Sequence, residues 1–278
     1  MEHESALRLG VFLGLFAVFA LWESLAPRRP RSQPFAPRWR TNWALVLIDT
    51  GALRLLSLVL PLLAVGAALD AAALNIGLFN RLGWPVWLEF LLALLVLDLA
   101  IWAQHLLTHK IPLLWRFHRV HHADVDMDVT TAIRFHPVEI AASMLLKIGL
   151  VYLLGPAALA VLVFEVLLNG TALFNHANIR MPAPAERLIR LLLVTPDMHR
   201  IHHSIHRAEH DSNYGFALSL WDRLFGTYTA SPAQGQTAMV TGLNWQTKAP
   251  SQTDPAQPNE PQSGPSQLGW SLWLPFRS

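Results

Sequence analysis

The chain has 278 residues, of which 53% are hydrophobic and only 14% are charged, and it contains 13 histidines and no cysteine. Because a soluble domain carries about 25% charged residues, this composition favours a membrane protein over an ordinary soluble globule. The absence of cysteine excludes disulfides, thiolate-bound metals and thiol catalysis, and the small formal net charge of +2 argues against nucleic acid as a partner.

Four apolar stretches reach or approach the length of about 20 residues that a helix needs to cross a bilayer. Residues 9–25 form the first, and the lack of a small-residue cleavage site predicts a retained helix rather than a signal peptide. Residues 43–69 and 84–102 form the next two. Residues 138–175 are too many for one helix and contain Gly155-Pro156, which predicts a helical hairpin. The sequence thus predicts an all-α integral membrane bundle of about four to five spans, the last two a hairpin.

The charges in the loops predict the orientation of this bundle. The connection between the first two spans is rich in arginine, whereas residues 70–83 carry only Arg81. By the positive-inside rule, the first connection lies in the cytoplasm. Counting spans then places the segments after the third span and after His176 on the cytoplasmic side, where we expect a helical cap. The arginines of the first connection are Arg28, Arg29, Arg31, Arg38 and Arg40.

The C-terminal part of the chain differs in composition from the rest. Residues 246–267 are rich in Pro, Gln and Ser, which cannot support a packed core. We therefore expect three parts: N-terminal helices with the Arg-rich loop (1–84), a histidine-containing domain (85–230) and a largely disordered tail (231–278). The aromatic end of the tail, residues 269–276, fits either a segment at the membrane interface or a frayed terminus.

Twelve of the 13 histidines lie between positions 105 and 210, and eight of them recur at helical spacing. Residues four apart share a helix face, whereas a residue three along is turned aside, so a triplet can serve two neighbouring metal ions. Buried imidazoles in this density would be costly without a ligand for their ring nitrogens. The pattern therefore predicts a site for two metal ions. One pair and two triplets compose it: His105 and His109; His118, His121 and His122; and His199, His202 and His203.

These three motifs, together with the membrane helices, resemble the fatty acid hydroxylase and sterol desaturase superfamily. The similarity covers residues 85–230 and extends to segments that match its bacterial sterol-desaturase-like members. Those segments are residues 115–122 (WRFHRVHH), 131–137 (TAIRFHP), 174–178 (FNHAN), 195–203 (TPDMHRIHH), 213–216 (NYGF) and 221–228 (WDRLFGTY).

The resemblance implies a multi-pass protein of the bacterial inner membrane, with residues 85–230 as a catalytic domain that holds two non-haem iron ions, or zinc in a purified sample. Such a centre uses O2 as cosubstrate to hydroxylate or desaturate a C–H bond of a fatty acyl, sterol-like or ether lipid. Electrons are expected from a separate carrier of the cytochrome b5-like or ferredoxin type. No catalytic residue apart from the metal ligands is implied. The implied ligands are His105, His109, His118, His121, His122, His176, His199, His202 and His203.

Other polar residues lie close to these motifs in sequence. His136 and His206 are expected to support the ligands or the fold, and no role is assigned to His210 or His3. Some acidic and amide side chains are expected either to orient an imidazole by accepting its ring N–H or to cap turns and helices. These candidates are Asp197, Asp222 and Asn213.

Two other classes of protein remain open from the histidine pattern. A membrane metal transporter or metal-binding protein without oxygenase activity would place its ligands near the membrane midplane. A bis-histidine haem protein would need two histidines on facing helices inside the bilayer. The placement of the histidines relative to the spans separates these classes from the lipid oxidoreductase.

Overall fold

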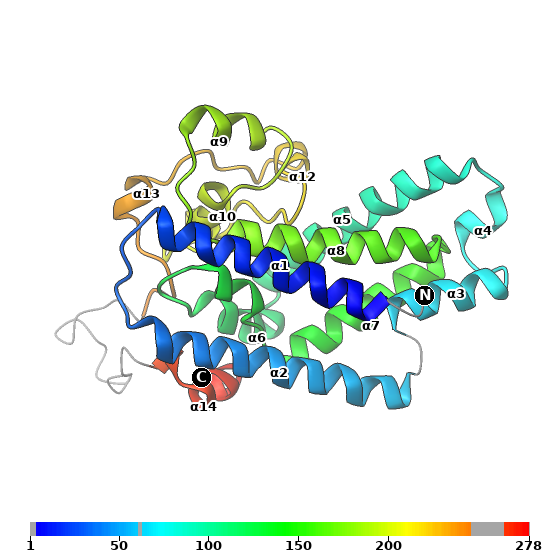
Figure 1. Cartoon of the computed structure of the whole chain (residues 1–278), viewed down its shortest axis with the longest axis horizontal. Helices are drawn as coiled ribbons and strands as arrows, with labels where there is room; N and C mark the ends of the chain where they lie inside the picture. Colours follow the sequence, from blue (N-terminus) through cyan, green and yellow to red (C-terminus); the bar gives the residue numbers. More distant parts are fainter. Residues whose placement is uncertain (1–3, 61–62, 246–263, 278) are drawn as a thin grey trace.

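The computed structural model describes residues 4–60, 63–245 and 264–277, in which helices predominate (Figure 1). Five segments carry a helix long and apolar enough to cross a membrane. This confirms the predicted all-α bundle of a multi-pass membrane protein. The five long helices are α1 (Glu4–Leu25), α2 (Phe35–Val59), α5 (Val86–Lys110), α7 (Pro137–Leu154) and α8 (Ala158–His176).

The apolar stretch at residues 43–69 does not form a single helix. Helix α2 ends at Val59, and a shorter helix, α3 (Ala64–Ala73), begins five residues later. Leu60 precedes a proline in the sequence and has the extended conformation that proline imposes on the residue before it. The alanine-rich face of α3 packs closely on α7 and α8, where it contacts Met144, Val151 and Val161.

Helices α7 and α8 form the predicted hairpin, which turns at Gly155. Gly155 has a positive φ of 65°, and a Cβ atom there would lie 2.6 Å from the carbonyl oxygen of Ile76. Gly77, with a φ of 99°, would in turn place a Cβ atom against the backbone of Gly155. This second glycine precedes the short helix α4 (Leu78–Leu82). The two connections therefore touch backbone to backbone, which only glycine permits.

Apart from α3 and α4, the short helices gather at one end of the bundle and form a cap, at the end where α1, α5 and α8 finish (Figure 1). Most of them are shorter than eight residues, so their positions depend on packing and on side-chain hydrogen bonds rather than on helix propensity. The cap elements are α6 (Pro112–His122), η1 (Val129–Ile133), α9 (Ala183–Ile189), α10 (Pro196–His202), α11 (Arg207–His210), α12 (Leu220–Leu224), α13 (Gly235–Ala238), η3 (Gly264–Ser266), α14 (Leu268–Trp273) and η4 (Leu274–Phe276).

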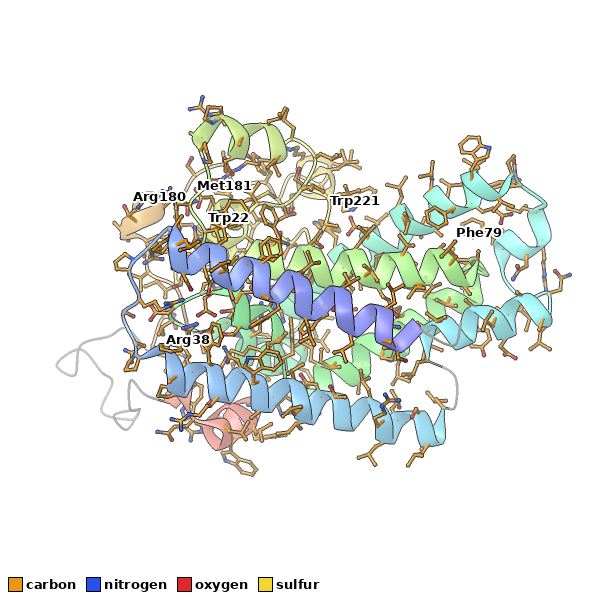
Figure 2. All side chains as sticks on the ribbon, in the orientation of Figure 1. Trp22, Arg38, Phe79, Arg180, Met181 and Trp221 are labelled. Carbon is orange, nitrogen blue, oxygen red and sulfur yellow. The ribbon has the colours of Figure 1, made fainter. Side chains whose placement is uncertain are left out.

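The Arg-rich connection between α1 and α2 is tied to this cap by ion pairs. Figure 2 shows Arg38 at the cap end of α2, where its buried guanidinium pairs with Asp124 at 2.6 Å and also with Asp128. Arg28 pairs with Asp197 at 3.1 Å. These two arginines therefore bind acidic groups of the cap.

The prediction of a largely disordered tail is wrong for residues 264–277, and residues 246–263 lie outside the described part of the chain. Trp270 and Leu274 are buried against Leu45 of α2 and Val120 of α6. The guanidinium of Arg134 donates to the carbonyl oxygen of Pro265 at 2.9 Å and to the hydroxyl of Ser271 at 2.8 Å. Residues 231–245 also contribute buried side chains, so the C-terminal segment is part of the cap core.

Candidate metal centre

The nine histidines predicted as ligands converge at the junction of the spans and the cap. They form two buried groups, and in each group one ring nitrogen per residue lies within 4.8 Å of the others. The first group is His105, His109, His118, His122 and His202. The second group is His121, His176, His199 and His203.

Helical periodicity explains how each triplet divides between the groups. His118 and His122 are four residues apart and enter the first group, whereas His121 is turned toward the second. The other triplet divides in the opposite sense, because His202 enters the first group while His199 and His203 enter the second. Each triplet thus contributes to both groups, as its spacing predicts.

Backbone carbonyl oxygens fix the orientation of four of these rings. A carbonyl oxygen only accepts hydrogen bonds, so the Nδ1 atom that contacts it carries the proton and Nε2 keeps a lone pair. The contacts are His105 to Tyr214 at 2.7 Å, His121 to Arg134 at 3.2 Å, His176 to Ala172 at 2.7 Å and His202 to Ser212 at 2.8 Å.

The lone pairs left on Nε2 point at one another. In the first group, the Nε2 atoms of all five histidines are buried without a hydrogen-bond partner among the described residues. In the second group, Nε2 of His176 lies 3.1 Å from Nε2 of His121 and 3.1 Å from Nε2 of His199. Since His121 and His176 both donate through Nδ1, no proton lies between their Nε2 atoms. A cation between them would convert this repulsion into ligation.

Burial keeps the histidines of the cap neutral. Desolvation lowers the pKa of five of them well below the usual value of 6.5, and neighbouring imidazoles lower it further. They therefore offer lone pairs at neutral pH, which is the state that binds metal. The five are His121, His122, His199, His202 and His203.

The donor set fits a pair of transition-metal ions. Imidazole nitrogen suits iron, zinc, copper and nickel, whereas calcium and magnesium prefer oxygen ligands. The 3.1 Å separation of Nε2 atoms in the second group suits two ligands of one ion, whose bonds to nitrogen are about 2.0–2.1 Å for zinc.

Glu139 of α7 is a functional candidate that the sequence reasoning missed. Its Oε1 atom lies 2.6 Å from Nδ1 of His118, so it accepts the ring N–H and leaves Nε2 to face the first group. An acidic residue two positions after His136-Pro137, at the start of an apolar stretch, was the available signal.

Of the two roles expected for Asp197, Asp222 and Asn213, the structure favours the support of turns and of other side chains over direct contact with an imidazole. Both oxygens of the Asp222 carboxylate accept backbone N–H groups, from Tyr214 and Gly215 at 2.8 Å each, so Asp222 supports the carbonyl that orients His105 only indirectly. Asp197 pairs with Arg28 and Arg200, and Asn213 bonds the backbone of Met198 and Thr229.

Of the remaining histidines, His136 supports the start of α7 and His210 lies beside the first group. His136 caps α7 by accepting the N–H of Val138 and contacts the carbonyl oxygen of Leu272, so its role is structural. His210, to which the sequence assigned no role, lies with Asp211 close to His109 at the rim of the first group. His206 is exposed, and His3 lies outside the described residues.

A cavity of about 240 Å³ opens onto the first group from inside the bundle. His105 and His118 line one end, and no histidine of the second group contributes to its walls. Between the ends, the walls are mostly apolar and include Ile101, Met144 and Leu168. The geometry therefore gives an alkyl chain access to the first group and not to the second.

Comparison with known proteins agrees with this arrangement. A sequence model of the fatty acid hydroxylase family matches residues 90–227, a segment that contains all nine histidines and Glu139. The ornithine lipid hydroxylase OlsE of Rhizobium tropici is 28% identical over 236 residues, which are 84% of this chain and 70% of that protein. No solved structure matches the chain significantly.

Two animal enzymes are similar over shorter parts of their length. Human alkylglycerol monooxygenase is 31% identical over 206 residues, which are 73% of this chain and 41% of that protein. Rat cholesterol 25-hydroxylase is 28% identical over 143 residues, which are 51% of this chain and 47% of that protein. The chain thus spans less than half the length of these two relatives.

Proposed function

Because this chain belongs to the fatty acid hydroxylase superfamily, we propose that it is a membrane-bound oxidoreductase that uses O2 and two non-haem iron ions to hydroxylate a C–H bond of a lipid. The observation that carries the proposal is the convergence of nine buried imidazoles on two points, one of which faces an apolar cavity between the spans. The names of these three relatives, each a hydroxylase or a monooxygenase, favour hydroxylation over desaturation.

Different residues of the site would bind the metal ions, orient the ligands and receive the substrate. We propose that the first group holds one ion and the second group the other, with the nine histidines as ligands. Iron ions at these positions would supply the activation of O2 and the removal of hydrogen from carbon. The chain orients the imidazoles through backbone carbonyls and Glu139, and the mostly apolar walls of its cavity would receive the alkyl chain that carries the reacting carbon.

The proposed reaction also requires a source of electrons, and the donor must reach the cap from its side of the membrane. We propose a separate electron-transfer protein, of the cytochrome b5-like or ferredoxin type, as the donor, and a bacterial inner membrane as the location. The Arg-rich connection at the cap end of α1 and α2 supports a cap on the cytoplasmic side, where such a carrier has access.

The position of the histidines disfavours a metal transporter and a bis-histidine haem protein. His105 and His109 lie in the last two turns of α5, and His176 is the last residue of α8. The other ligand candidates belong to the cap. Transporter ligands would lie near the midplane of the spans, and a haem would leave most of these imidazoles without a partner.

The proposal is tested by metal content and lipid oxidation together. The protein is purified in detergent under iron-replete conditions, iron and zinc per chain are measured, and membrane lipids are followed by mass spectrometry after addition of reductant and O2. His202→Ala removes a first-group ligand and His121→Ala a second-group ligand. His206→Ala is the matched control, because His206 is exposed and belongs to neither group.

We expect two metal ions per chain and a lipid that gains one oxygen atom, with both lost in the two ligand variants and kept in the control. A lipid that loses two hydrogen atoms would make the reaction a desaturation. Absence of a two-metal centre and of any oxidised lipid, with metal uptake into vesicles, would replace the proposal with a transporter.

A further inference from the structure

Two neighbouring segments of the cap, residues 183–193 and 217–228, expose large apolar side chains on one side of the molecule. The backbone N–H of Ser219 donates to the carbonyl oxygen of Leu192 at 3.0 Å, and the Ser219 hydroxyl donates to the carbonyl oxygen of Arg190 at 2.8 Å. These bonds join helices α9 and α12 into one unit, which we call the α9–α12 surface. Its apolar side chains are 46–70% exposed, and they are Leu188, Leu191, Leu192, Leu220, Leu224 and Phe225. An exposed apolar surface of this kind marks a contact with lipid or with another protein.

The α9–α12 surface is attached to the side of the candidate span α5. The carboxylate of Asp98 in α5 accepts the backbone N–H groups of residues 217–218 at 3.3 and 3.2 Å and the indole N–H of Trp221 at 2.8 Å. The ring of Phe225 stacks on that of Trp102 with a centroid distance of 4.6 Å. A charged residue inside a span thus has the role of holding part of the cap against that span.

The level of this attachment along α5 places α12 beside the bilayer. The exposed Trp84 and Trp87 at the start of α5 suit the membrane interface far from the cap. About 20 residues cross the hydrocarbon core, so a core that begins with α5 ends near His105. At 1.5 Å per residue, Asp98 and Trp102 lie about 10 and 5 Å before that point. This depth is the one at which amphipathic segments bury their apolar face, about 5–10 Å.

Positive charges accompany the apolar side chains. The exposed charged residues of the two segments are Arg187 and Arg223. Both line a surface cleft of about 490 Å³, together with Leu191. The carboxylates that line this cleft already have cationic partners: Glu186 pairs with Arg190, and Asp197 pairs with Arg28 and Arg200. The cleft therefore has an excess of positive charge beside apolar side chains, which suits the headgroup and acyl chains of an anionic lipid.

We propose that the α9–α12 surface lies in the bilayer interface, with its leucines among acyl chains and with Arg187 and Arg223 bound to anionic lipid headgroups. The bilayer fits better than a soluble acidic protein, because α12 is level with a span and the exposed side chains are mostly apolar. This contact fixes the depth of the cap, and with it the depth of the histidine groups. The inference goes beyond the proposed reaction, since contact with lipid requires neither metal nor turnover.

Quenching of a single fluorescent label by lipids tests the contact. The chain has no cysteine, so one cysteine can be introduced into the full-length protein and labelled with bimane. The labelled protein is placed in vesicles that contain phosphatidylcholine or phosphatidylglycerol with a nitroxide on the acyl chain. We expect strong quenching at Leu191→Cys and Leu224→Cys, as at the span control Leu95→Cys. Ala238→Cys is the aqueous control, because residue 238 is exposed on α13 at the outer end of the cap (Figure 1).

The choice between the two lipids tests the arginines. At low salt, we expect phosphatidylglycerol to quench the label at Leu224→Cys at a lower lipid fraction than phosphatidylcholine. Arg187→Gln should reduce this preference about fivefold, the effect of one arginine near an anionic surface. The matched control is Arg207→Gln, which removes an arginine that is 82% exposed on α11, outside both segments. It should leave the preference unchanged.

Labels at residues 191 and 224 that behave like the label at 238, quenched by aqueous iodide and not by lipid, would overturn the inference. Protection from both quenchers that increases with protein concentration would overturn it as well, and would assign the surface to a second copy of the chain. Equal quenching by the two lipids, or equal effects of Arg187→Gln and Arg207→Gln, would refute headgroup binding by the arginines. None of these results depends on metal content or lipid oxidation, so this inference and the proposed function can fail separately.

Discussion

Replacement of Glu139 by glutamine tests the division of the nine histidines into two sites. The carboxylate accepts the Nδ1–H of His118 at 2.6 Å, and both side chains are largely buried, with exposed fractions of 10% and 2%. Glutamine can still accept this proton, so the ring keeps its tautomer, but the negative charge that makes the imidazole a stronger ligand is lost. A hydrogen bond to a charged group contributes about 1.5–3 kcal/mol, equivalent to about 10- to 150-fold in an equilibrium constant.

Because Glu139 contacts only the first group among the ligand histidines of the described chain, the loss is expected in one of two metal equivalents. Competition with a chromophoric chelator would show two phases in the unaltered protein. In Glu139→Gln, one phase weakens about 10- to 100-fold and the other is unchanged. Asp70→Asn, which removes a carboxylate at the far end of the bundle, should change neither phase. A normal titration from a stable Glu139→Gln protein, or equal weakening of both phases, would refute the reasoning.

Three further predictions concern stability. In the metal-free folded protein the five cap histidines stay neutral, whereas in the unfolded chain they gain protons near the ordinary histidine pKa of about 6.5. The free energy of unfolding therefore decreases as pH falls below about 6.5, by up to about 1.4 kcal/mol per pH unit for each histidine. A melting temperature that is constant from about pH 8 to about pH 5.5 would contradict this sign. Trp270→Ala should destabilise the protein by about 3–5 kcal/mol, measured by thermal unfolding in detergent, whereas a tail that does not pack would show no change. Gly77→Ala should lower the melting temperature more than Gly83→Ala, because the Cβ atom at residue 77 meets backbone while residue 83 faces open space. Equal effects of the two glycine variants would refute the backbone contact with Gly155.

The sequence predicts how each histidine triplet divides between the two groups, because that division depends on local helical spacing. The spacing of three and four within each triplet determines which rings share a face, and the structure divides both triplets as that spacing indicates. The partners of the rings are not local. Tyr214 supplies its carbonyl to His105 from a loop 109 residues away, and nothing in the sequence identifies that atom. Glu139 was missed for the same reason, since its contact with His118 depends on how α7 packs beside α6.

The C-terminal segment shows a different failure of sequence reasoning. The composition of residues 246–267 predicts disorder, and the prediction extends to the whole segment 231–278, which includes residues with strong partners elsewhere. Trp270 packs in a cluster with Leu45 and Val120, and Arg134 bonds the segment through Ser271. A short stretch becomes ordered when a preformed surface receives it, which composition does not report.

The need for free carbonyl oxygens explains why the candidate metal centre lies at the edge of the spans. Carbonyls inside a helix are already bonded within it, and irregular backbone that could supply others is not tolerated where it faces lipid. Three of the four oriented rings obtain their acceptors from nonhelical backbone or a helix end in the cap: His105 from Tyr214, His121 from Arg134 and His202 from Ser212. The fourth, His176, is oriented by the carbonyl of Ala172 one turn before the end of α8, which is also at the cap. A centre built from oriented imidazoles therefore belongs to the cap, and a substrate inside the bilayer can meet it only through a cavity that runs from the spans to its rim. The cavity that is lined by His105 and His118 and by Ile101, Met144 and Leu168 of the spans has this course.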